Sequence, residues 1–284
     1  MKKRSDIQVL SWGGYPYGKQ KAVCFTFDDC NWTSHRIALI LKIKGVRATF
    51  FLNTKLITTK FYYRWQYLVL KWLGFELGSH TRNHTVLTKV RPEVAESELR
   101  QSQDDLFRTY GRKPSVFSYP ESQSNDITDA VVYKYYNAIR YNTMVERQQC
   151  YHIRTKTTAE EYDNLSDDFI QGSNSAMVIG GHGADGQGYE PISSRNLIRW
   201  VNRLKKRKDV IWFATFGELT MFEKVRNSVY VSLQGNQISF DIEKIRPLMQ
   251  IYPDTPFLYC VVVQKGENRD IITVDLRNKT QFFI

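Results

Sequence analysis

Two adjacent carboxylates and a pair of histidines are the residues of this chain best suited to chemistry. Asp28 and Asp29 close an apolar run in Thr26-Phe27-Asp28-Asp29, and His80 and His84 follow further along the chain. A buried carboxylate is costly without a cationic partner, and two neighbouring carboxylates also repel each other. If the two histidines are helical, their Cβ atoms lie about 6 Å apart and both imidazoles can bind one ion. The pattern therefore predicts a divalent metal with a base beside it.

A set of three protein ligands would make this metal site catalytic. One Asp oxygen and two imidazoles leave coordination positions open for water and substrate, whereas structural sites are closed. A His-x-x-x-His pair by itself is more often two ordinary histidines. The carboxylate pair and a third histidine, His182, at the end of another predicted strand favour the metal site.

Alternating strand and helix patterns, which must position these side chains, run from Ala22 to about Gly217. Such alternation is typical of repeated βα units. Strands are predicted at 22–29, 47–54, 76–81, 115–119, 137–142, 151–156, 176–181 and 210–216, with helices at 37–44, from about 61, at 92–110 and around 197–204. The polar motifs fall at strand ends, where barrel enzymes build their active sites. We therefore predict an α/β fold, a distorted (β/α) barrel of seven or eight strands.

Three segments are predicted along the chain. Residues 1–20 form an N-terminal extension, residues 21–224 the barrel domain, and residues 225–284 a small β-rich C-terminal domain. The last is expected to be an antiparallel β appendage, with strands at 229–233, 237–242, 257–263 and 271–276 separated by turn residues. Its alternation indicates one buried face. A carbohydrate-binding module, a dimerisation surface and a lid all remain open as its role.

The formal net charge of +11 favours anionic polymers as partners or substrates. The basic run at 205–208 ends a predicted helix, where cations complement the helix dipole. Because no nucleic-acid motif accompanies it, no nucleic-acid partner is expected. No segment is apolar enough for a transmembrane span, and the oligomeric state is left open.

The start of the chain and its cysteines bear on where the protein works. Residues 1–4 resemble the charged start of a secretion signal, but polar residues follow where an apolar stretch is needed. No export signal is visible, so either the protein works in the cytoplasm or a signal has been removed. The four scattered cysteines, Cys24, Cys30, Cys150 and Cys260, are expected to be free thiols or core residues.

Several short motifs carry a family resemblance over residues 22–219. They are Thr26-Phe27-Asp28-Asp29, Ser79-His80 with His84, the strand at 48–52, Gly181-His182, and the segment at 212–219. Together they resemble the motifs of the NodB-like polysaccharide deacetylases, the fourth carbohydrate esterase family. The resemblance implies the NodB homology fold, a distorted (β/α) barrel. Members of this family usually work outside the cytoplasm.

The resemblance also implies a role for each motif residue. Asp29, His80 and His84 would bind Zn2+ or a similar divalent ion such as Co2+ or Ni2+. Asp28 would be the general base that deprotonates the attacking water. His182 would protonate the leaving group, a task that suits the ordinary pKa of an imidazole, near 6.5.

The third family motif is incomplete in this chain. Ser118 stands where an Arg usually precedes the Pro and pairs with the base, and Glu121 replaces a Tyr. The backbone N–H after the Pro usually helps to hold the oxyanion, so Glu121 could still donate it, and Tyr119 is a further candidate for substrate or oxyanion contact. Arg140 either replaces the lost guanidinium or caps a strand at the surface.

Two aromatic residues near the motifs are candidate platforms for a sugar ring. Trp32 follows Asp29 by three positions, and Tyr189 lies in the segment after His182. The alternative is that both side chains pack within their loops, because Trp and Tyr often bury the apolar part of the ring while the polar group contacts water.

The sequence thus predicts a metal-dependent hydrolase that removes acetyl groups from a polysaccharide or oligosaccharide. N-acetyl groups are the expected target, and O-acetyl groups are the second candidate. Its partner would be an acetylated glycan, including an anionic cell-wall or surface polysaccharide. The alternative is a glycan-binding protein that keeps the fold and the metal site but has lost efficient turnover. Ser118 and Glu121 motivate that alternative. The sugar, the linkage and the native metal are not predicted.

Overall fold

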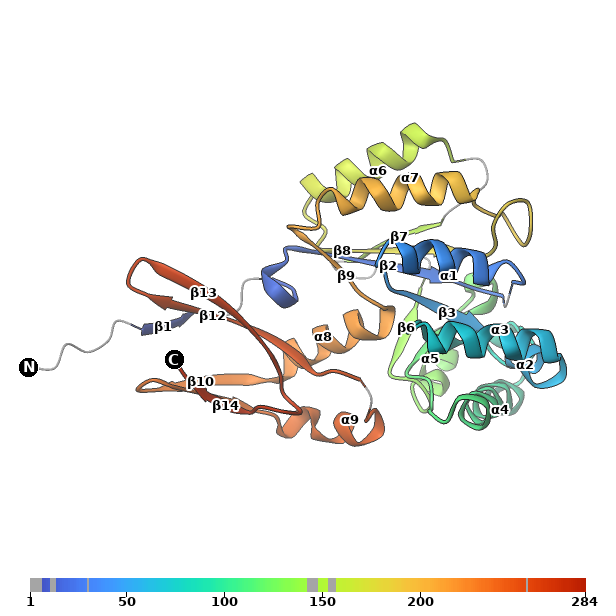
Figure 1. The fold of residues 1–284 in the computed structure, drawn as a ribbon. Coiled ribbons are helices and arrows are strands. Elements are labelled where there is room, and N and C mark those ends of the chain that lie inside the picture. Colours follow the sequence, from blue (N-terminus) through green and yellow to red (C-terminus); the bar gives the residue numbers. More distant parts are fainter. Residues whose placement is uncertain (1–6, 11–13, 30, 142–147, 153–156, 254) are drawn as a thin grey trace, which may run out of the picture. The chain divides into compact units, whose positions relative to one another are not determined.

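The chain divides into two compact units in a computed structural model that describes residues 7–10, 14–29, 31–141, 148–152, 157–253 and 255–284 (Figure 1). The first, which we call the barrel unit, comprises residues 23–207 and 213–217. The second, the β unit, comprises the described residues up to Ala22 together with 208–212 and 218–284. The β unit is therefore discontinuous in sequence.

An eight-stranded sheet organises the barrel unit. Its strand order is β6-β5-β4-β3-β2-β8-β7, with β9 pairing with β2. The pairs β2–β3, β3–β4, β4–β5, β5–β6 and β7–β8 are parallel. The bounds are β2 (Lys21–Phe27), β3 (Ala48–Leu52), β4 (Glu76–Ser79), β5 (Val116–Ser118), β6 (Ala138–Arg140), β7 (Gln148–His152), β8 (Ala176–Gly181) and β9 (Ile211–Phe213). Strands β3, β5 and β8 are buried along their whole length, as parallel strands covered on both faces are. The predicted α/β class is confirmed; residues 153–156 of one predicted strand lie outside the described residues.

Seven helices of the described chain belong to the barrel unit. They are α1 (Ser34–Ile43), α2 (Thr54–Thr59), α3 (Phe61–Trp72), α4 (Pro92–Tyr110), α5 (Asp126–Val132), α6 (Ala159–Gln171) and α7 (Ser194–Lys205). The longest, α4, begins with Pro92 in its first turn and ends at Gly111, whose φ of 74° supplies the left-handed cap. Within the described residues no helix combines the length and the apolar character needed to cross a membrane.

Two three-stranded antiparallel sheets form the β unit, in the orders β1-β12-β13 and β10-β11-β14. Their bounds are β1 (Ile7–Leu10), β10 (Tyr230–Gln234), β11 (Gln237–Asp241), β12 (Leu258–Lys265), β13 (Asn268–Asp275) and β14 (Gln281–Phe283). Helix α9 (Arg246–Ile251) and most of α8 (Phe216–Ser228) complete the unit. The predicted C-terminal antiparallel strands are present. Strand β1, from the segment expected as an extension, pairs with β12 from Ile7 opposite Lys265.

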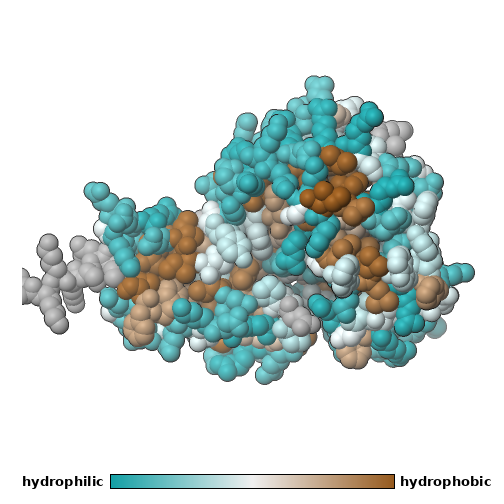
Figure 2. Space-filling view, viewed as in Figure 1, coloured by the Kyte–Doolittle hydropathy of each residue, from teal (hydrophilic) through white to brown (hydrophobic). Residues whose placement is uncertain are grey.

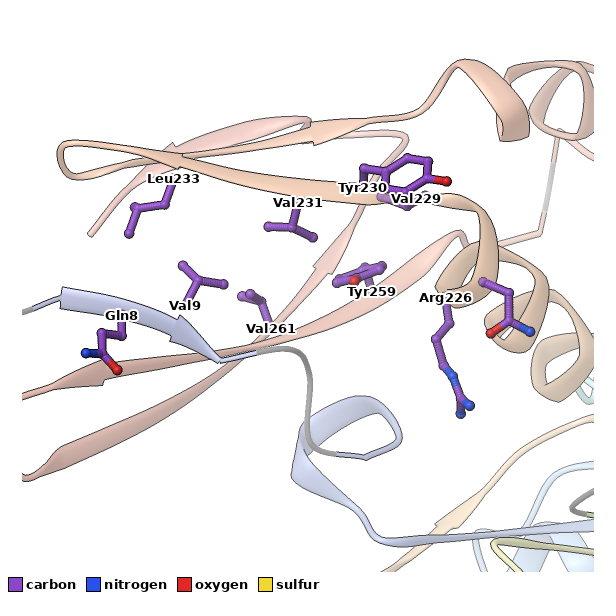
Figure 3. A pocket seen from close by; sticks show the side chains of 10 residues that line it. Gln8, Val9, Arg226, Val229, Tyr230, Val231, Leu233, Tyr259 and Val261 are labelled. Atoms are coloured by element: carbon purple, nitrogen blue, oxygen red, sulfur yellow. The ribbon is translucent and has the colours of Figure 1, made fainter.

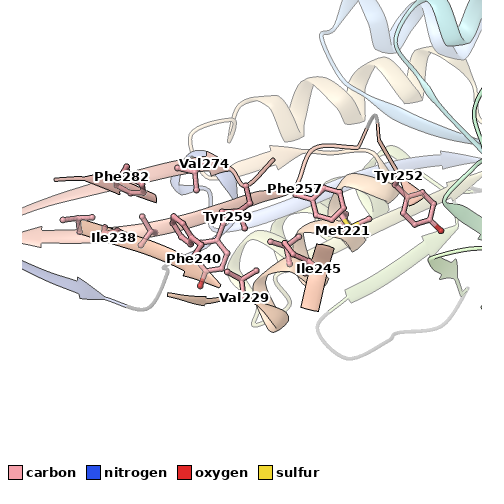
Figure 4. Packing of buried hydrophobic residues seen from close by; sticks show 14 residues of the cluster. Met221, Val229, Ile238, Phe240, Ile245, Tyr252, Phe257, Tyr259, Val274 and Phe282 are labelled. Atoms are coloured by element: carbon pink, nitrogen blue, oxygen red, sulfur yellow. The ribbon is translucent and has the colours of Figure 1, made fainter. Parts of the chain in front are cut away.

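An apolar cluster holds the β unit together. Side chains from α8, β11, β12 and β14 meet in it, among them Met221, Ile238, Tyr259 and Phe282 (Figure 4). Burying aliphatic and aromatic side chains of this kind stabilises each by about 1.5–3 kcal/mol relative to exposure. The β unit therefore has a core of its own.

The β unit also contains a groove of about 690 Å³ (Figure 3). Side chains of β1, β10 and β12 line it, including Val9, Val231, Leu233 and Val261. Arg226 is the only formally charged residue among those that line it. The groove therefore lacks the carboxylate and imidazole groups that hydrolysis requires.

Candidate active site

The carboxylate pair lies directly after β2, as predicted. The backbone N–H of Asp28 donates to the carbonyl of Gly181 at the end of β8 over 2.9 Å. Asp29 has a φ of 71°, in the left-handed region that a non-glycine residue rarely adopts. Such strain persists only where surrounding contacts enforce it, and it is common in functional sites.

Asp29 meets both histidines of the predicted ligand set. Its Oδ1 lies 3.1 Å from Nε2 of His84 and 3.3 Å from Nε2 of His80. The potential ligand atoms of the three residues all lie within 4.8 Å of one another. Among the described residues, no other group of three or more potential metal ligands lies this close together.

The two histidines are not on a helix, contrary to the geometry considered from their spacing. They lie in the loop that follows β4. Thr81 and His84 in this loop have φ angles of 63° and 61°, and these left-handed residues fold the loop so that the rings approach with their centroids 4.9 Å apart. The convergence of the two imidazoles thus comes from an irregular loop.

The hydrogen bonding of His80 shows that the cluster fits a cation. Its Nδ1 lies 2.8 Å from the carbonyl oxygen of Ser118, which can only accept, so Nδ1 carries the proton. That bond leaves Nε2 as the ring atom that faces Asp29 Oδ1, a buried oxygen without a hydrogen-bond partner in the described chain. Ligands at 2.0–2.2 Å from zinc stand about 3–3.5 Å apart in a tetrahedral or octahedral site. The distances from Asp29 Oδ1 to the two imidazole nitrogens agree with that requirement.

The ionisation of Asp29 agrees with the same interpretation. Burial raises the pKa of Asp29, but the polar contacts and charges of His80 and His84 outweigh it and hold the pKa well below its ordinary value. The contact with Asp29 raises the pKa of His84, against the opposing effect of burial. Asp29 is therefore an ionised carboxylate, the form that binds metals.

Two acidic residues of α4 hold the loop between the histidines. Glu98 Oε2 accepts hydrogen bonds from the backbone N–H groups of Arg82 and Asn83, at 3.0 and 2.9 Å. Asp105 Oδ2 accepts from Arg82 Nε and from Thr54 Oγ1, both at 3.0 Å. Both carboxylates are buried. Sequence reasoning missed them, although they adjoin the predicted core face of α4.

Arg140 lies on the other carboxylate of the pair. Its guanidinium donates to Asp28 Oδ2, to Ser118 Oγ at 2.8 Å and to Thr26 Oγ1 at 2.8 Å. Arg140 is only 3% exposed, so it is not a surface cap. The guanidinium that the third motif lacks is thus supplied from the end of β6. Asp28 Oδ1 is buried and has no hydrogen-bond partner in the described chain.

His182 follows β8 and faces the same cluster. Its Nε2 lies 3.7 Å from Asp29 Oδ2, and its ring packs edge-on against Tyr189 with centroids 5.2 Å apart. Burial lowers the pKa of His182; Asp28 and Asp29 oppose that shift, and Arg140 adds to it. A histidine whose pKa is lowered is a stronger acid when it is protonated.

The predicted third-motif residues take different positions. Glu121 is half exposed, pairs with Lys89 at 2.9 Å, and has a left-handed φ of 51°. Tyr119 is buried, and its hydroxyl donates to Asp129 over 2.7 Å. Burial raises the pKa of Tyr119. The interpretation of the Tyr119 side chain as a substrate contact is therefore corrected: it packs in the core, because Asp129 holds its hydroxyl there.

The two aromatic candidates remain accessible to a ligand. Trp32 is 44% exposed and its Nε1 donates to Gln187 Oε1 over 3.2 Å. Tyr189 is 66% exposed and covers one edge of His182. Of the cysteines, Cys24 and Cys260 are buried and form no disulfide bond within the described residues. Cys30, and the side chain of Cys150, lie outside the described residues.

The strand ends of the parallel sheet thus gather an Asp-His-His cluster, a second carboxylate and a third histidine. Residues 16–138 match the family model described as "Polysaccharide deacetylase". The resemblance recognised from the motifs is therefore confirmed over these residues, which make up less than half of the chain. The match ends before β8, so it does not include His182.

Three relatives illustrate the similarity. YxkH of Bacillus subtilis (strain 168), assigned to the polysaccharide deacetylases, is 28% identical over 111 residues, which are 38% of this chain and 40% of that protein. A protein of Mycobacterium smegmatis with the same assignment has a TM-score of 0.59 at 15% identity, covering 81% of this chain and 99% of that one. A peptidoglycan N-acetylglucosamine deacetylase has a TM-score of 0.51 at 21% identity, covering 71% and 88%. These solved structures confirm the predicted fold.

Pseudoenzymes of the same family are also among the solved structures with similar TM-scores. The fold is therefore shared by active and inactive proteins. Turnover has to be argued from the site and measured.

Proposed function

We propose that this protein hydrolyses acetyl groups, N-acetyl in preference to O-acetyl, from an acetylated glycan. The observation that carries the proposal is that the two neighbouring carboxylates make different contacts. Asp29 is committed to the two histidines, while Asp28 keeps one buried oxygen without a partner in the described chain. A hydrolase of this class needs both a ligand carboxylate and a separate base.

Asp29, His80 and His84 would hold a divalent ion, most simply zinc, with cobalt or nickel as alternatives. When bound, the ion supplies Lewis-acid polarisation of the acetyl carbonyl and makes water more acidic. His80 is oriented for this role by Ser118, since the bond from Nδ1 to the Ser118 carbonyl fixes the ring and its tautomer.

Asp28 is the proposed general base. Arg140 and Ser118 both donate to its Oδ2, which leaves Oδ1 to take a proton from the attacking water. The guanidinium gives the buried carboxylate a partner of opposite charge and fixes its orientation.

His182 is the proposed general acid. It would donate its proton to the leaving amine, or to the leaving alcohol of an ester. Tyr189 packs against its ring and limits how the imidazole can turn. The Glu121 backbone N–H is the proposed further donor to the oxyanion, and Trp32 and Tyr189 are the proposed sugar platforms because both rings are exposed.

An acetate-release screen tests the proposal. Chitin oligomers, peptidoglycan, poly-N-acetylglucosamine and acetylxylan would each be supplied with zinc, cobalt or nickel. Asp28→Asn is the matched control, because it keeps the shape of the side chain and removes the base. Acetate release that needs Asp28 and a metal supports the proposal. Saturable binding of acetylated oligosaccharides without acetate release under any metal would replace it with the glycan-binding alternative.

A further inference from the structure

The outer face of α3 exposes large apolar side chains. Phe61, Trp65, Leu68 and Trp72 are 82%, 56%, 38% and 84% exposed. They follow one another at spacings of four, three and four residues, so on an α-helix they project within roughly 60° of one another. Scattered exposed hydrophobic residues need no explanation, but a continuous stripe of them does.

The opposite face of α3 already anchors the helix to the barrel unit. Gln66 Nε2 and Tyr67 OH both donate to the carbonyl of Asn31, at 3.0 and 3.4 Å, and Leu70 is fully buried. The outer stripe is therefore not required to attach α3 to the core. An amphipathic helix needs only one apolar face for that purpose.

Helix α1 extends the exposed stripe. Leu39 and Ile43 are 54% and 73% exposed, and α1 lies in contact with α3. Figure 2, in the view of Figure 1, shows hydrophobic side chains at the surface over these two helices. We call this surface the α1–α3 face and define it by six residues: Leu39, Ile43, Phe61, Trp65, Leu68 and Trp72.

The segment that forms this face carries charges of one sign only. From Asn31 to Phe75 the chain carries eight Lys and Arg residues and no Asp or Glu. Lys60 and Arg64 are exposed beside the stripe on α3, and Lys42 is exposed on α1. The eight cations, set against the net charge of +11, concentrate most of the positive balance of the protein in this segment.

We propose that the α1–α3 face docks the protein on an anionic lipid surface. Exposed Trp and Phe beside Lys and Arg are the residues that anchor proteins at the interface between lipid headgroups and acyl chains. The 12 residues of α3 extend only about 18 Å, too short to cross a bilayer core of about 30 Å, so the helix would lie in the interface. Anionic headgroups would complement the cations.

Two other occupants fit the face less well. A second copy would bring two sets of these cations together, and like charges repel. A soluble polyanion would pair with the cations but would leave Leu39, Ile43 and Leu68 without apolar partners. A lipid surface satisfies both the charges and the aliphatic side chains.

Docking would place the candidate site close to the lipid. The loop that α3 holds at Asn31 begins directly after the Asp dyad, and Tyr62 of α3 donates to the carbonyl of Trp32 over 3.4 Å. Substrates attached to the lipid surface, or emerging from it, would then be favoured. The docking proposal does not depend on turnover, and its test has a binding readout.

Co-sedimentation of the full chain with vesicles tests the proposal. Vesicles of phosphatidylcholine would be compared with vesicles that also contain phosphatidylglycerol. The parent protein is expected to bind the anionic vesicles. Combined Trp65→Ala and Trp72→Ala should lower the partition coefficient at least about tenfold, since each removes most of an aromatic side chain that the lipid would bury. Lys60→Gln and Arg64→Gln should each lower it about fivefold, on anionic vesicles only.

Phe107→Ala is the matched control, because Phe107 is an aromatic residue of α4, 49% exposed and outside the face. It should leave binding unchanged, and circular dichroism would verify that every variant is folded. The proposal is overturned if the parent does not bind anionic vesicles, or if the double Trp variant binds as well as the parent. It is also overturned if the Trp substitutions only convert a dimer to a monomer, or if soluble polyphosphate binds in a Trp-independent way and accounts for all the affinity.

Discussion

Asp28 and Asp29 are neighbours in the sequence, but the regions that support them are built differently. Asp28 is held by the end of a strand: Arg140 of β6 and Ser118 of β5 donate to one of its oxygens. Asp29 meets histidines of an irregular loop, and that loop is held by Glu98 and Asp105 of α4. One support is part of the sheet, and the other is a loop fixed to a helix.

The difference suggests that the base and the metal ligands can be altered separately. A strand end is positioned by its ladder and by the core, whereas a loop with left-handed residues depends on side-chain hydrogen bonds. A substitution that weakens the contacts to Asp28 should affect the base, and a substitution that weakens the contacts to the histidine loop should affect the metal ligands. The following variants test that separation.

Asp28→Asn should have the largest effect. We expect kcat to fall roughly a hundredfold to ten-thousandfold, because the amide cannot take the proton of the attacking water. Acetate release measures this, and metal analysis should show unchanged metal content because Asp28 is not a proposed ligand. Loss of bound metal in this variant would break the proposed separation.

Arg140→Met should affect both stability and the base. Removing one partner of a buried ion pair typically costs about 3–5 kcal/mol, because the other charge is left without compensation. Urea unfolding measures the stability, and kcat should fall while metal affinity changes little. Arg140→Lys, which keeps the charge but loses the planar fork, should give an intermediate loss. A variant as stable as the parent would contradict the strand-end support.

Glu98→Gln should act on the loop instead. Residues that orient metal ligands typically contribute about 10–100-fold to metal affinity, and the amide NH2 of Gln cannot accept the hydrogen bond that Asn83 Nδ2 donates to Glu98 Oε1. Competition with a chelator measures the affinity, while kcat at saturating metal should stay within a few-fold. Glu96→Gln is the control, because Glu96 lies on the same helix but pairs with the surface residue Lys134. Equal effects from the two variants would show that the loop does not need Glu98.

Asp185→Asn should have the smallest effect, as a carboxylate paired outside the site. Hydrogen bonds from Ser194, and then Arg36, lower the pKa of Asp185 from 3.8 in the folded state. The contribution of Asp185 to the free energy of unfolding is therefore present above pH 3.8 and is lost as the pH falls through the lowered pKa. We expect less than about 1 kcal/mol, since the pair is partly exposed. Unfolding at pH 7 and pH 3 measures it; a difference that grows at pH 3 would have the wrong sign.

The strand ends could be predicted from sequence because buried parallel strands are short apolar runs with polar residues after them. The prediction placed the strands that precede Asp28, His80 and His182 within about two residues of β2, β4 and β8. It failed for β1 and β14, which have four and three residues and too little alternation to recognise. Helix α2 was missed because three of its six residues are Thr, which favours strands.

The supports of the site were harder to predict than its motifs. Glu98 and Asp105 are charged residues of an amphipathic helix, and such residues usually face solvent. Nothing in their spacing shows that a loop from another part of the chain covers them. Arg140 could be named because the missing Arg of the third motif required a substitute, whereas Tyr119 gave no sign that Asp129 would hold its hydroxyl in the core. Long-range partners of this kind depend on the tertiary fold.

The pairing of β1 with β12 has a consequence for the order in which the chain can fold. Ile7 leaves the ribosome long before its partner Lys265, which lies more than 250 residues further along the chain. During that interval β1 has no strand to pair with, while the barrel unit, whose strands are close in sequence, can form. Completion of the β1-β12-β13 sheet is therefore expected to be a late event in co-translational folding. A ribosome-stalled chain that ends before β12 should accordingly leave β1 sensitive to protease.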